Sequence, residues 1–398
     1  MTRKTLKRIV KITLSVIIIT LAIVLVLAAA GLTYLHLTDY SPPPMVNVVV
    51  QNNTKKGLIE KDELSLITWN IGYCGLDKSM DFFYDGGKQV RPKDSTFQKN
   101  LNGVFHFLSE NDSVDFILLQ EVDTAARRSY YTNEVSLFSQ ALPNYAYCFS
   151  TNYNVKYVPL PVFNPMGAVV SGITTFSRFS PSASVRYAYP VSFAWPLKLV
   201  MLDRCFLLQR YPLANGQDLV LIHLHNSAFG NADVLRQYEL WMLRGFLLME
   251  YAQGNYVIAA GDWNENPPNY EKSFYHSGFF KKYGSPQIPK DYMPANWHYS
   301  YDSKTPTNRD VNEAYRPGLT PTTTLDFYLT SPNIVIDQVQ TINGNFEFSD
   351  HQPVFIRVFL NNDPMTGCTE DCLDEVVRLK DTIQTQKEAL PKKWVKKK

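Results

Sequence analysis

The sequence predicts a layered α/β protein that is preceded by one membrane-spanning helix. Three observations support this fold class. A long uncharged apolar run lies near the N-terminus, β-type apolar runs alternate with helical stretches through the rest of the chain, and short polar strings follow several of those runs. With 398 residues, 45% of them hydrophobic and 19% charged, the chain is long enough for one large core.

The N-terminus predicts a signal-anchor helix. Residues 1–11 hold five Lys/Arg and no acid, and an uncharged run from Ile12 to Thr38 follows. About 20 apolar residues span a bilayer as a helix, so residues 12–37 are expected to do so. A cleaved signal peptide is the alternative, because Ala28-Ala29-Ala30 offers small residues, but the run exceeds the roughly 7–15 residues typical of such peptides. Since basic residues stay on the cytoplasmic side, everything after Tyr40 is expected outside the cytoplasm, at the cell membrane.

A stalk, one large domain and a tail are expected to follow this helix. Residues 38–62 mix proline, asparagine and lysine and form the stalk, residues 63–362 form the domain, and residues 363–398 form a helical and basic tail. Strands are expected at Leu64–Ile71, Val114–Val122, Tyr145–Ser150, Ala168–Phe176, Arg204–Arg210, Asp218–His225, Tyr256–Ala260, Thr324–Leu329, Val335–Val339 and Gln352–Phe359. Helices are expected at Thr96–Glu110, with Asp94-Ser95 as its N-cap, at Ala232–Tyr251 and at Asp371–Leu390. Residues 284–323 are irregular and polar, which is typical of a substrate-binding wall.

The charge distribution argues against a dedicated binder of duplex DNA. The net charge of +2 comes from the two ends, since residues 12–362 hold 26 of the 39 Lys/Arg and 30 of the 37 Asp/Glu. A duplex-DNA binder usually carries a basic surface that displaces counterions. The five cysteines imply no disulfide framework.

Glu121 and Asn70 are the first candidate metal ligands. Glu121 follows the apolar run Phe116–Leu119, where a carboxylate is costly to desolvate unless it meets a cation. Magnesium usually takes only one or two protein carboxylates, and the amide of Asn70 at the end of the preceding strand fits that requirement. A surface glutamate in a turn is the alternative.

Asp262 and Asn264 flank Trp263 after the strand Tyr256–Ala260. Residues two apart on an extended segment point to the same side, so this acid and this amide are expected to face one site. The acid can orient or deprotonate a water, the amide can donate to a phosphoryl oxygen, and Gly261 allows a close backbone approach. An Asx turn before Pro267 is the alternative.

His351 follows Asp350 and precedes an apolar strand. A histidine suits proton transfer near neutral pH but needs a partner that fixes its tautomer. Asp326, an acid in the apolar strand Leu325–Leu329, is the expected partner.

His223 and His225 point to one face of their strand. Two histidines on one face could bind zinc, but a third ligand with clear spacing is not evident. His225 ends the strand, where sites tend to lie, and is therefore expected to stabilise a phosphoryl oxygen. His223 is expected to be a buried histidine whose ring is satisfied by hydrogen bonds.

The order of these motifs and the residues in them resemble the endonuclease/exonuclease/phosphatase superfamily, over residues 64–360. Its members include pancreatic deoxyribonuclease, abasic-site endonucleases, neutral sphingomyelinases and inositol-polyphosphate 5-phosphatases. The resemblance implies a four-layered αββα sandwich with two central mixed sheets. It also implies in-line attack of an activated water on phosphorus, with Mg²⁺ (or Mn²⁺) as cofactor. In this chain it assigns Asn70, Glu121 and Asp350 to the metal, His225 and Asn264 to the phosphate, Asp262 to the nucleophile, and Asp326 to the orientation of His351.

The stretch Asp81–Lys88 and the string Arg127-Arg128-Ser129-Tyr130-Tyr131 resemble a membrane-associated bacterial branch of the superfamily. The tryptophan in Gly261-Asp262-Trp263-Asn264 departs from the family pattern, which has a smaller or aliphatic residue there; the change removes no required group.

Two substrate classes remain open. Nucleic acid would be bound by basic and aromatic groups, for which Arg127, Arg128, Lys88 and Arg91 are candidates. A phospholipid head group would suit the anchor and an apolar surface such as Phe193–Leu197, unless that stretch packs in the core. No obligate protein partner is evident. The rival function is a non-catalytic, membrane-tethered binding module with the same fold.

Overall fold

The computed structural model describes residues 3–54, 57–228, 233–270 and 286–361. The helix expected at Asp371–Leu390, like the rest of the expected tail, lies outside the described residues. The division of the chain into stalk, domain and tail stays a prediction.

Two mixed sheets form the centre of the fold. The six-stranded sheet has the order β14-β15-β2-β3-β5-β4, and the seven-stranded sheet has the order β1-β6-β7-β8-β9-β13-β10. The strands of the first are β2 (Glu63–Asn70), β3 (Phe116–Asp123), β4 (Ala146–Val158), β5 (Gly167–Ser177), β14 (Ile334–Thr341) and β15 (Val354–Leu360). Those of the second are β1 (Met45–Asn47), β6 (Ala183–Ala188), β7 (Cys205–Pro212), β8 (Asp218–His225), β9 (Tyr256–Asp262), β10 (His298–Ser300) and β13 (Asp326–Thr330).

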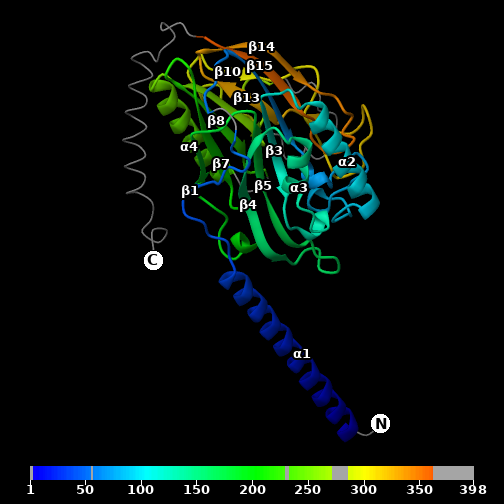
Figure 1. The fold of residues 1–398 in the computed structure, drawn as a ribbon. Coiled ribbons are helices and arrows are strands. Elements are labelled where there is room, and N and C mark those ends of the chain that lie inside the picture. The colour runs from blue at the N-terminus through cyan, green and yellow to red at the C-terminus, as the bar shows by residue number, and fades with distance from the viewer. Residues whose placement is uncertain (1–2, 55–56, 229–232, 271–285, 362–398) are drawn as a thin grey trace.

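The two sheets pack face to face, and helices cover their outer faces (Figure 1). Alternation along the strands explains the packing: Leu64 and Leu66 of β2 face the other sheet, whereas Ile67 and Trp69 face the helices. The helices α2 (Asp94–Glu110) and α3 (Glu134–Ala141) cover the six-stranded sheet, and α4 (Asp233–Ala252) covers the seven-stranded one. This is the expected four-layered αββα sandwich.

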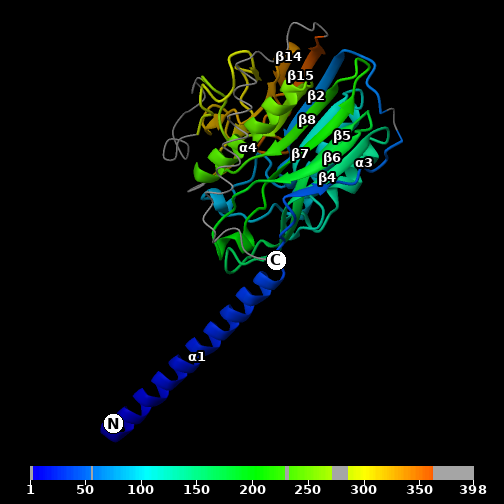
Figure 2. The ribbon, with the colours of Figure 1, turned by 90° about the vertical axis from the view of Figure 1, so that its left-hand side faces the viewer.

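The helix α1 (Arg3–Leu37) extends away from the sandwich in both views (Figures 1 and 2). Its apolar side chains are exposed, and it is long and apolar enough to cross a membrane. It begins nine residues before the expected Ile12, so the basic residues of the N-terminus belong to the same helix.

Three local expectations are corrected. The second helix begins at Asp94 with Lys93 as N-cap and no capping side chain, so the expected cap of Asp94-Ser95 is wrong. The short α3, the edge strand β1 and its neighbour β6 were not expected. Within the irregular residues 284–323 lie β10 and a two-stranded ribbon of β11 (Asn308–Arg309) and β12 (Thr322–Thr323).

The sheet register brings the candidate residues to one edge. The strands β2 and β3 are parallel, with Asn70 opposite Gln120, and β8 and β9 are parallel, with His225 opposite Asp262. Asp326 begins β13 opposite Asp262. Because the two sheets are stacked, the ends of these strands enclose one shared site.

Candidate active site

Asn70 and Glu121 lie side by side at the ends of neighbouring strands. The strand β3 has a bulge between Leu119 and Val122, and Glu121 within it takes a left-handed backbone conformation with φ of 54°. Such strain in a non-glycine residue is typical of functional sites. The glutamate side chain is 25% exposed, and its Oε1 lies 3.3 Å from Asn70 Nδ2.

Asp262 is the centre of the site. Its Oδ2 lies 3.0 Å from Asn70 Nδ2, 3.5 Å from His225 Nε2 and 3.8 Å from His351 Nε2. Its Oδ1 accepts a hydrogen bond of 2.8 Å from the backbone N–H of Asn264, so the Asx turn forms as well. Burial raises the pKa of Asp262 to about 7, and His351 opposes this rise. One oxygen thus shapes the loop while the other faces the site.

His351 and Asp326 form a buried pair, with 2.7 Å between Nδ1 and Oδ2. Burial by itself would lower the pKa of His351, but the carboxylates of Asp326 and Asp262 raise it to about 10. The other ring nitrogen, Nε2, lies 2.9 Å from Nδ2 of Asn308 in β11. An amide has both a donor and an acceptor, so Asn308 can serve either protonation state of the ring.

Asp350 adds a further buried carboxylate beside this pair. Burial raises the pKa of Asp350 to about 6; His351 opposes the rise and Glu121 adds to it. Asp85 is close enough to be affected by the same carboxylates. Burial raises the pKa of Asp85 to about 8, and the charges of Asp350, Asp310 and Glu121 add to the rise. This edge therefore gathers buried carboxyl groups whose ionised forms a bound cation would stabilise.

His225, Asn264 and Asn226 bring polar groups to the same edge. Burial, with Arg204 adding to it, holds the pKa of His225 well below its ordinary value. The side chain of Asn264 donates to the backbone carbonyl of Asn226 at 2.8 Å. Within the described part of the chain, Nδ2 of Asn226 and Nδ1 of His225 are buried without a hydrogen-bond partner.

His223 is the buried, satisfied histidine that the sequence predicts. Its Nε2 lies 2.7 Å from Gln120 Nε2, and its Nδ1 lies 3.0 Å from the Thr175 hydroxyl. Burial lowers its pKa to about 3, so the ring is neutral in the folded protein near neutral pH.

The two predicted substrate-binding arginines differ in their surroundings. The guanidinium of Arg128 is buried, donates two hydrogen bonds to Asp123 at 3.0 and 2.9 Å, and stacks 3.6 Å from the ring centre of Tyr73. Arg127 is partly exposed and donates to the backbone carbonyl of Pro165 at 3.0 Å. The charge of Arg128 is thus paired with Asp123 inside the protein.

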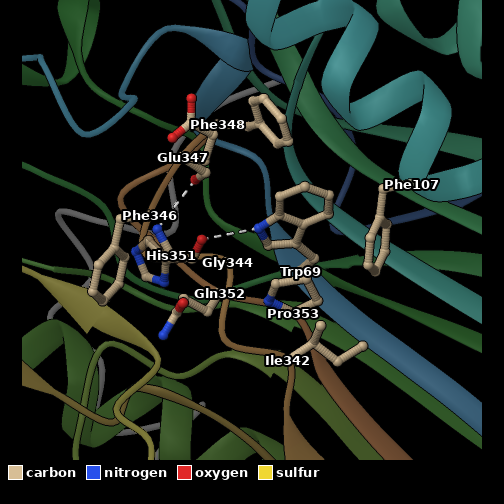
Figure 3. Close-up of a pocket in the computed structure, with 11 residues that line it drawn as sticks. Trp69, Phe107, Ile342, Gly344, Phe346, Glu347, Phe348, His351, Gln352 and Pro353 are labelled. Carbon is tan, nitrogen blue, oxygen red and sulfur yellow. Dashed lines mark hydrogen bonds between the residues drawn. The ribbon is translucent and has the colours of Figure 1, made fainter.

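A pocket with largely apolar side chains adjoins His351 (Figure 3). It is lined by Trp69, Phe107, Ile342, Gly344, Phe346, Glu347, Phe348, Ser349, His351, Gln352 and Pro353. The indole N–H of Trp69 donates to the backbone carbonyl of His351 at 3.0 Å. The pocket wall therefore helps to fix the backbone that presents the histidine.

Three side chains at the centre of the site lie close enough together to hold a metal ion. Asp262, Asp326 and His351 offer ligand atoms that all lie within 4.8 Å of one another, and within the described residues this is the one such group. Asp326 Oδ2 is already hydrogen-bonded to His351. The Oδ1 of Asn70 accepts a hydrogen bond of 3.0 Å from the backbone N–H of Gly72, and its Nδ2 faces Glu121 and Asp262. The carboxylates of Glu121 and Asp350 are further oxygen donors near this group.

A sandwich with carboxylates, a His–Asp pair and amides at one edge suits the hydrolysis of phosphoesters. The chain belongs to the endonuclease/exonuclease/phosphatase family, whose model matches residues 67–351. Members of this family hydrolyse phosphoesters and generally depend on divalent metal ions. No curated protein matches the chain.

The chain is similar to several solved structures at low sequence identity. An endonuclease/exonuclease/phosphatase from Beutenbergia cavernae DSM 12333 has a TM-score of 0.51 and 16% identity, over 76% of this chain and 72% of that one. D. rerio TDP2, solved in complex with single strand DNA product, has a TM-score of 0.45 and 16% identity, over 74% and 98%. ANGEL2, a 2',3'-cyclic phosphatase solved with adenosine-2',3'-vanadate, has a TM-score of 0.47 and 14% identity, over 79% and 99%.

Proposed function

We propose that the protein is a divalent-metal-dependent phosphodiesterase that residues 12–37 anchor in the cell membrane, with its catalytic domain outside the cytoplasm. The arrangement around Asp262 supports this most directly. One carboxylate oxygen lies within 3.8 Å of Asn70, His225 and His351, which lie at the ends of β2 and β8 and just before β15. Such convergence of an acid, an amide and two imidazoles suits water attack on a phosphate ester.

The site fits a hard divalent cation such as Mg²⁺. The carboxylates of Glu121 and Asp350 are its oxygen donors, and a bound cation would oppose the rise that burial causes in the pKa of Asp350. We assign the cation to Glu121, Asn70 and Asp350, because Asp326 is committed to His351. When bound there, it would neutralise charge that develops on the phosphoryl oxygens.

The chain's own residues perform the remaining steps in this proposal. Asp262 orients the attacking water and accepts its proton. His351, held by Asp326 and positively charged near neutral pH, stabilises the phosphoryl oxygens and donates a proton to the leaving oxygen as its bond to phosphorus breaks. His225 and Asn264 contact the non-bridging oxygens. The Nδ2 of Asn226, which has no hydrogen-bond partner within the described residues, is a further donor there.

The two arginines receive different roles. Arg128 fixes the loop after β3 through Asp123 and Tyr73, so we propose that it positions Glu121 without touching the substrate. Arg127, which is partly exposed, remains the candidate for a substrate contact.

The positions that a non-catalytic relative would lose first are filled here. Glu121, Asp262, Asp326 and His351 are present and lie together. This favours an enzyme over a membrane-tethered binding module.

Removal of the metal carboxylate or of the histidine tests the proposal. We expect Glu121→Gln and His351→Ala each to lower Mg²⁺-dependent hydrolysis of bis(para-nitrophenyl) phosphate by at least about a thousandfold. The measurement is the release of nitrophenol by the full-length protein in detergent micelles, with Mg²⁺ and with chelator. Full activity in either purified variant would contradict the site assignment.

Metal binding provides a control that is independent of turnover. Mg²⁺ bound to the folded state should raise the unfolding temperature of the wild type. The increase should disappear in Glu121→Gln and persist in Asp326→Asn. The reverse pattern would place the cation among Asp262, Asp326 and His351 instead.

A further inference from the structure

The edge that holds the active site also carries exposed apolar side chains. The loop between β4 and β5 presents Leu160, Val162 and Phe163, which are 48%, 72% and 101% exposed. The loop between β6 and β7 presents Trp195 and Leu197, which are 57% and 49% exposed. Apolar residues gathered in this way on a soluble surface mark an interaction site.

The strand register shows that the first loop leaves from the active-site edge. The strand β3 ends with Asp123 opposite Ser171 of β5, just past Glu121. The hairpin of β4 and β5 continues beyond that pair to Val158 opposite Gly167. Its tip therefore projects past the metal-binding end of β3.

The second loop leaves from the same edge of the other sheet. The pairing of β6 with β7 ends with Ala188 opposite Cys205, and Phe206 next to it lies opposite Leu224 of β8. His225, the site residue, follows Leu224. The segment with Trp195 and Leu197 thus projects past the end of β8.

The helix α1 meets the sandwich at these loops. It contacts β4 and the short helix η4 (Leu197–Val200), and Lys198 Nζ lies 2.6 Å from Asp39 Oδ2 just after the helix. Figures 1 and 2 both show α1 leaving from the end of the sandwich where the β4–β5 loop lies, opposite to the end of β15. The apolar surface of the anchor is thus continued by the two loops.

Two arginines, Arg91 and Arg127, lie behind the β4–β5 tip and form hydrogen bonds with its last residues. Arg91 donates to the side chain of Asn164 at 3.0 Å, and Arg127 donates to the carbonyl of Pro165. Cationic groups behind an apolar tip match the layering of a bilayer, where acyl chains lie beneath anionic head groups. Tryptophan, as at position 195, is enriched at this interface.

We propose that the Leu160–Phe163 tip and the Trp195–Leu197 segment dock on the bilayer that α1 spans, so that the active-site edge faces the membrane surface. This inference rests on the proposed anchor and hydrolase function, and it narrows the substrate to phosphodiesters presented at the lipid surface. Freely soluble nucleic acid would reach this edge only after undocking.

A fluorophore at the tip tests the docking without any need for activity. In the full chain with Cys368→Ser and Cys372→Ser, an environment-sensitive label is attached through Phe163→Cys; Cys74, Cys148 and Cys205 are buried. The matched control places the label through Phe359→Cys, an exposed apolar position near the far end of β15. The protein is reconstituted into vesicles that contain phosphatidylglycerol and brominated lipid.

We expect brominated lipid to quench the label at position 163 strongly and the label at position 359 weakly. Equal, weak quenching at both positions would overturn the proposal. A blue shift at position 163 without lipid quenching would also overturn it, because the tip would then be covered by protein.

Turnover separates this inference from the proposed function. Phe163→Ser with Leu197→Ser should lower the ratio of vesicle-borne to soluble diester hydrolysis about tenfold, because two apolar anchors are lost. Val335→Ser with Phe359→Ser, which removes exposed apolar groups from β14 and β15, should leave that ratio unchanged. If the wild type hydrolyses no diester, the proposed function fails, while the quenching result still decides whether the edge docks.

Discussion

At the scale of single residues, the two oxygens of Asp262 have different tasks. Oδ1 holds the backbone of Asn264 in an Asx turn, and Oδ2 faces three polar side chains of the site. The turn fixes the direction in which Oδ2 points, so the side chain is already placed before a substrate arrives. The raised pKa of Asp262, at about 7, suits a group that must gain and lose a proton near neutral pH.

His223 gives a pH-dependent contribution to stability that can be isolated. Its pKa is lowered from 6.5 to about 3, so the folded state keeps the ring neutral while the unfolded state protonates it below about pH 6.5. The unfolded state then binds one more proton, and stability falls as the pH drops through this window. Between about pH 6 and pH 4, the unfolding free energy of the wild type should fall more steeply than that of His223→Gln, by about 1.4 kcal/mol per pH unit.

Urea unfolding of both proteins at several pH values measures this difference. Other titrating groups are shared by the two proteins and cancel in the comparison. Parallel curves would show that His223 is not held neutral by the fold.

The principal site residues could be predicted from the sequence, but two asparagines could not. Asp262, Asp326 and His351 stand out because each is polar at the end or start of an apolar strand. Asn308 lies in the polar stretch 305–310, where an amide gives no contrast, and Asn226 directly follows His225, which draws the attention at that strand end. Only the tertiary fold brings Asn308 to His351, across 43 positions of the chain.

At the scale of elements, the site depends on how closely β8 and β9 approach. A Cβ atom added to Gly261 would lie 1.9 Å from the backbone carbonyl oxygen of Leu224, and φ of Gly261 is +144°. Glycine is therefore required next to Asp262 by both space and backbone conformation. It lets Asp262 lie directly opposite His225.

We expect Gly261→Ala to destabilise the protein by more than about 3 kcal/mol, because the strands must separate. The control is Gly216→Ala, at φ of +85° with open space around it, which should cost only about 1–2 kcal/mol. The measurement is the urea midpoint of each variant relative to the wild type. Equal losses would show that the close approach of β8 and β9 is not the cause.

The long, buried strands could be predicted closely, whereas short or exposed elements could not. The strand β8 was expected with the bounds that it has, Asp218–His225, because its residues from Leu219 to Leu224 are all apolar except His223. The helix α3 has only eight residues and the strand β6 is half-buried, so neither gives a clear periodicity. The start of α2 was misplaced because Asp94 lies within the first turn, where an acid favours the helix dipole.

At the scale of the whole molecule, the stacked sheets explain how residues from distant parts of the chain form one site. Each sheet contributes a parallel pair of strands that end at the same edge, β2 with β3 and β8 with β9. The αββα layering followed from the family resemblance, since alternating strands and helices alone indicate only a layered α/β fold. The orientation of the active-site edge toward α1 could not be read from the sequence, because it depends on the register of the hairpins.

The most direct test of the account is hydrolysis of bis(para-nitrophenyl) phosphate by the full-length protein and by Asp262→Asn, with Mg²⁺ and with chelator. We predict Mg²⁺-dependent turnover in the wild type and a loss of at least about a thousandfold in the variant, since the amide cannot accept the proton of the water. Both proteins should show the same cooperative unfolding. Turnover that is equal in the two proteins, or that persists in the wild type without a metal ion, would contradict the account.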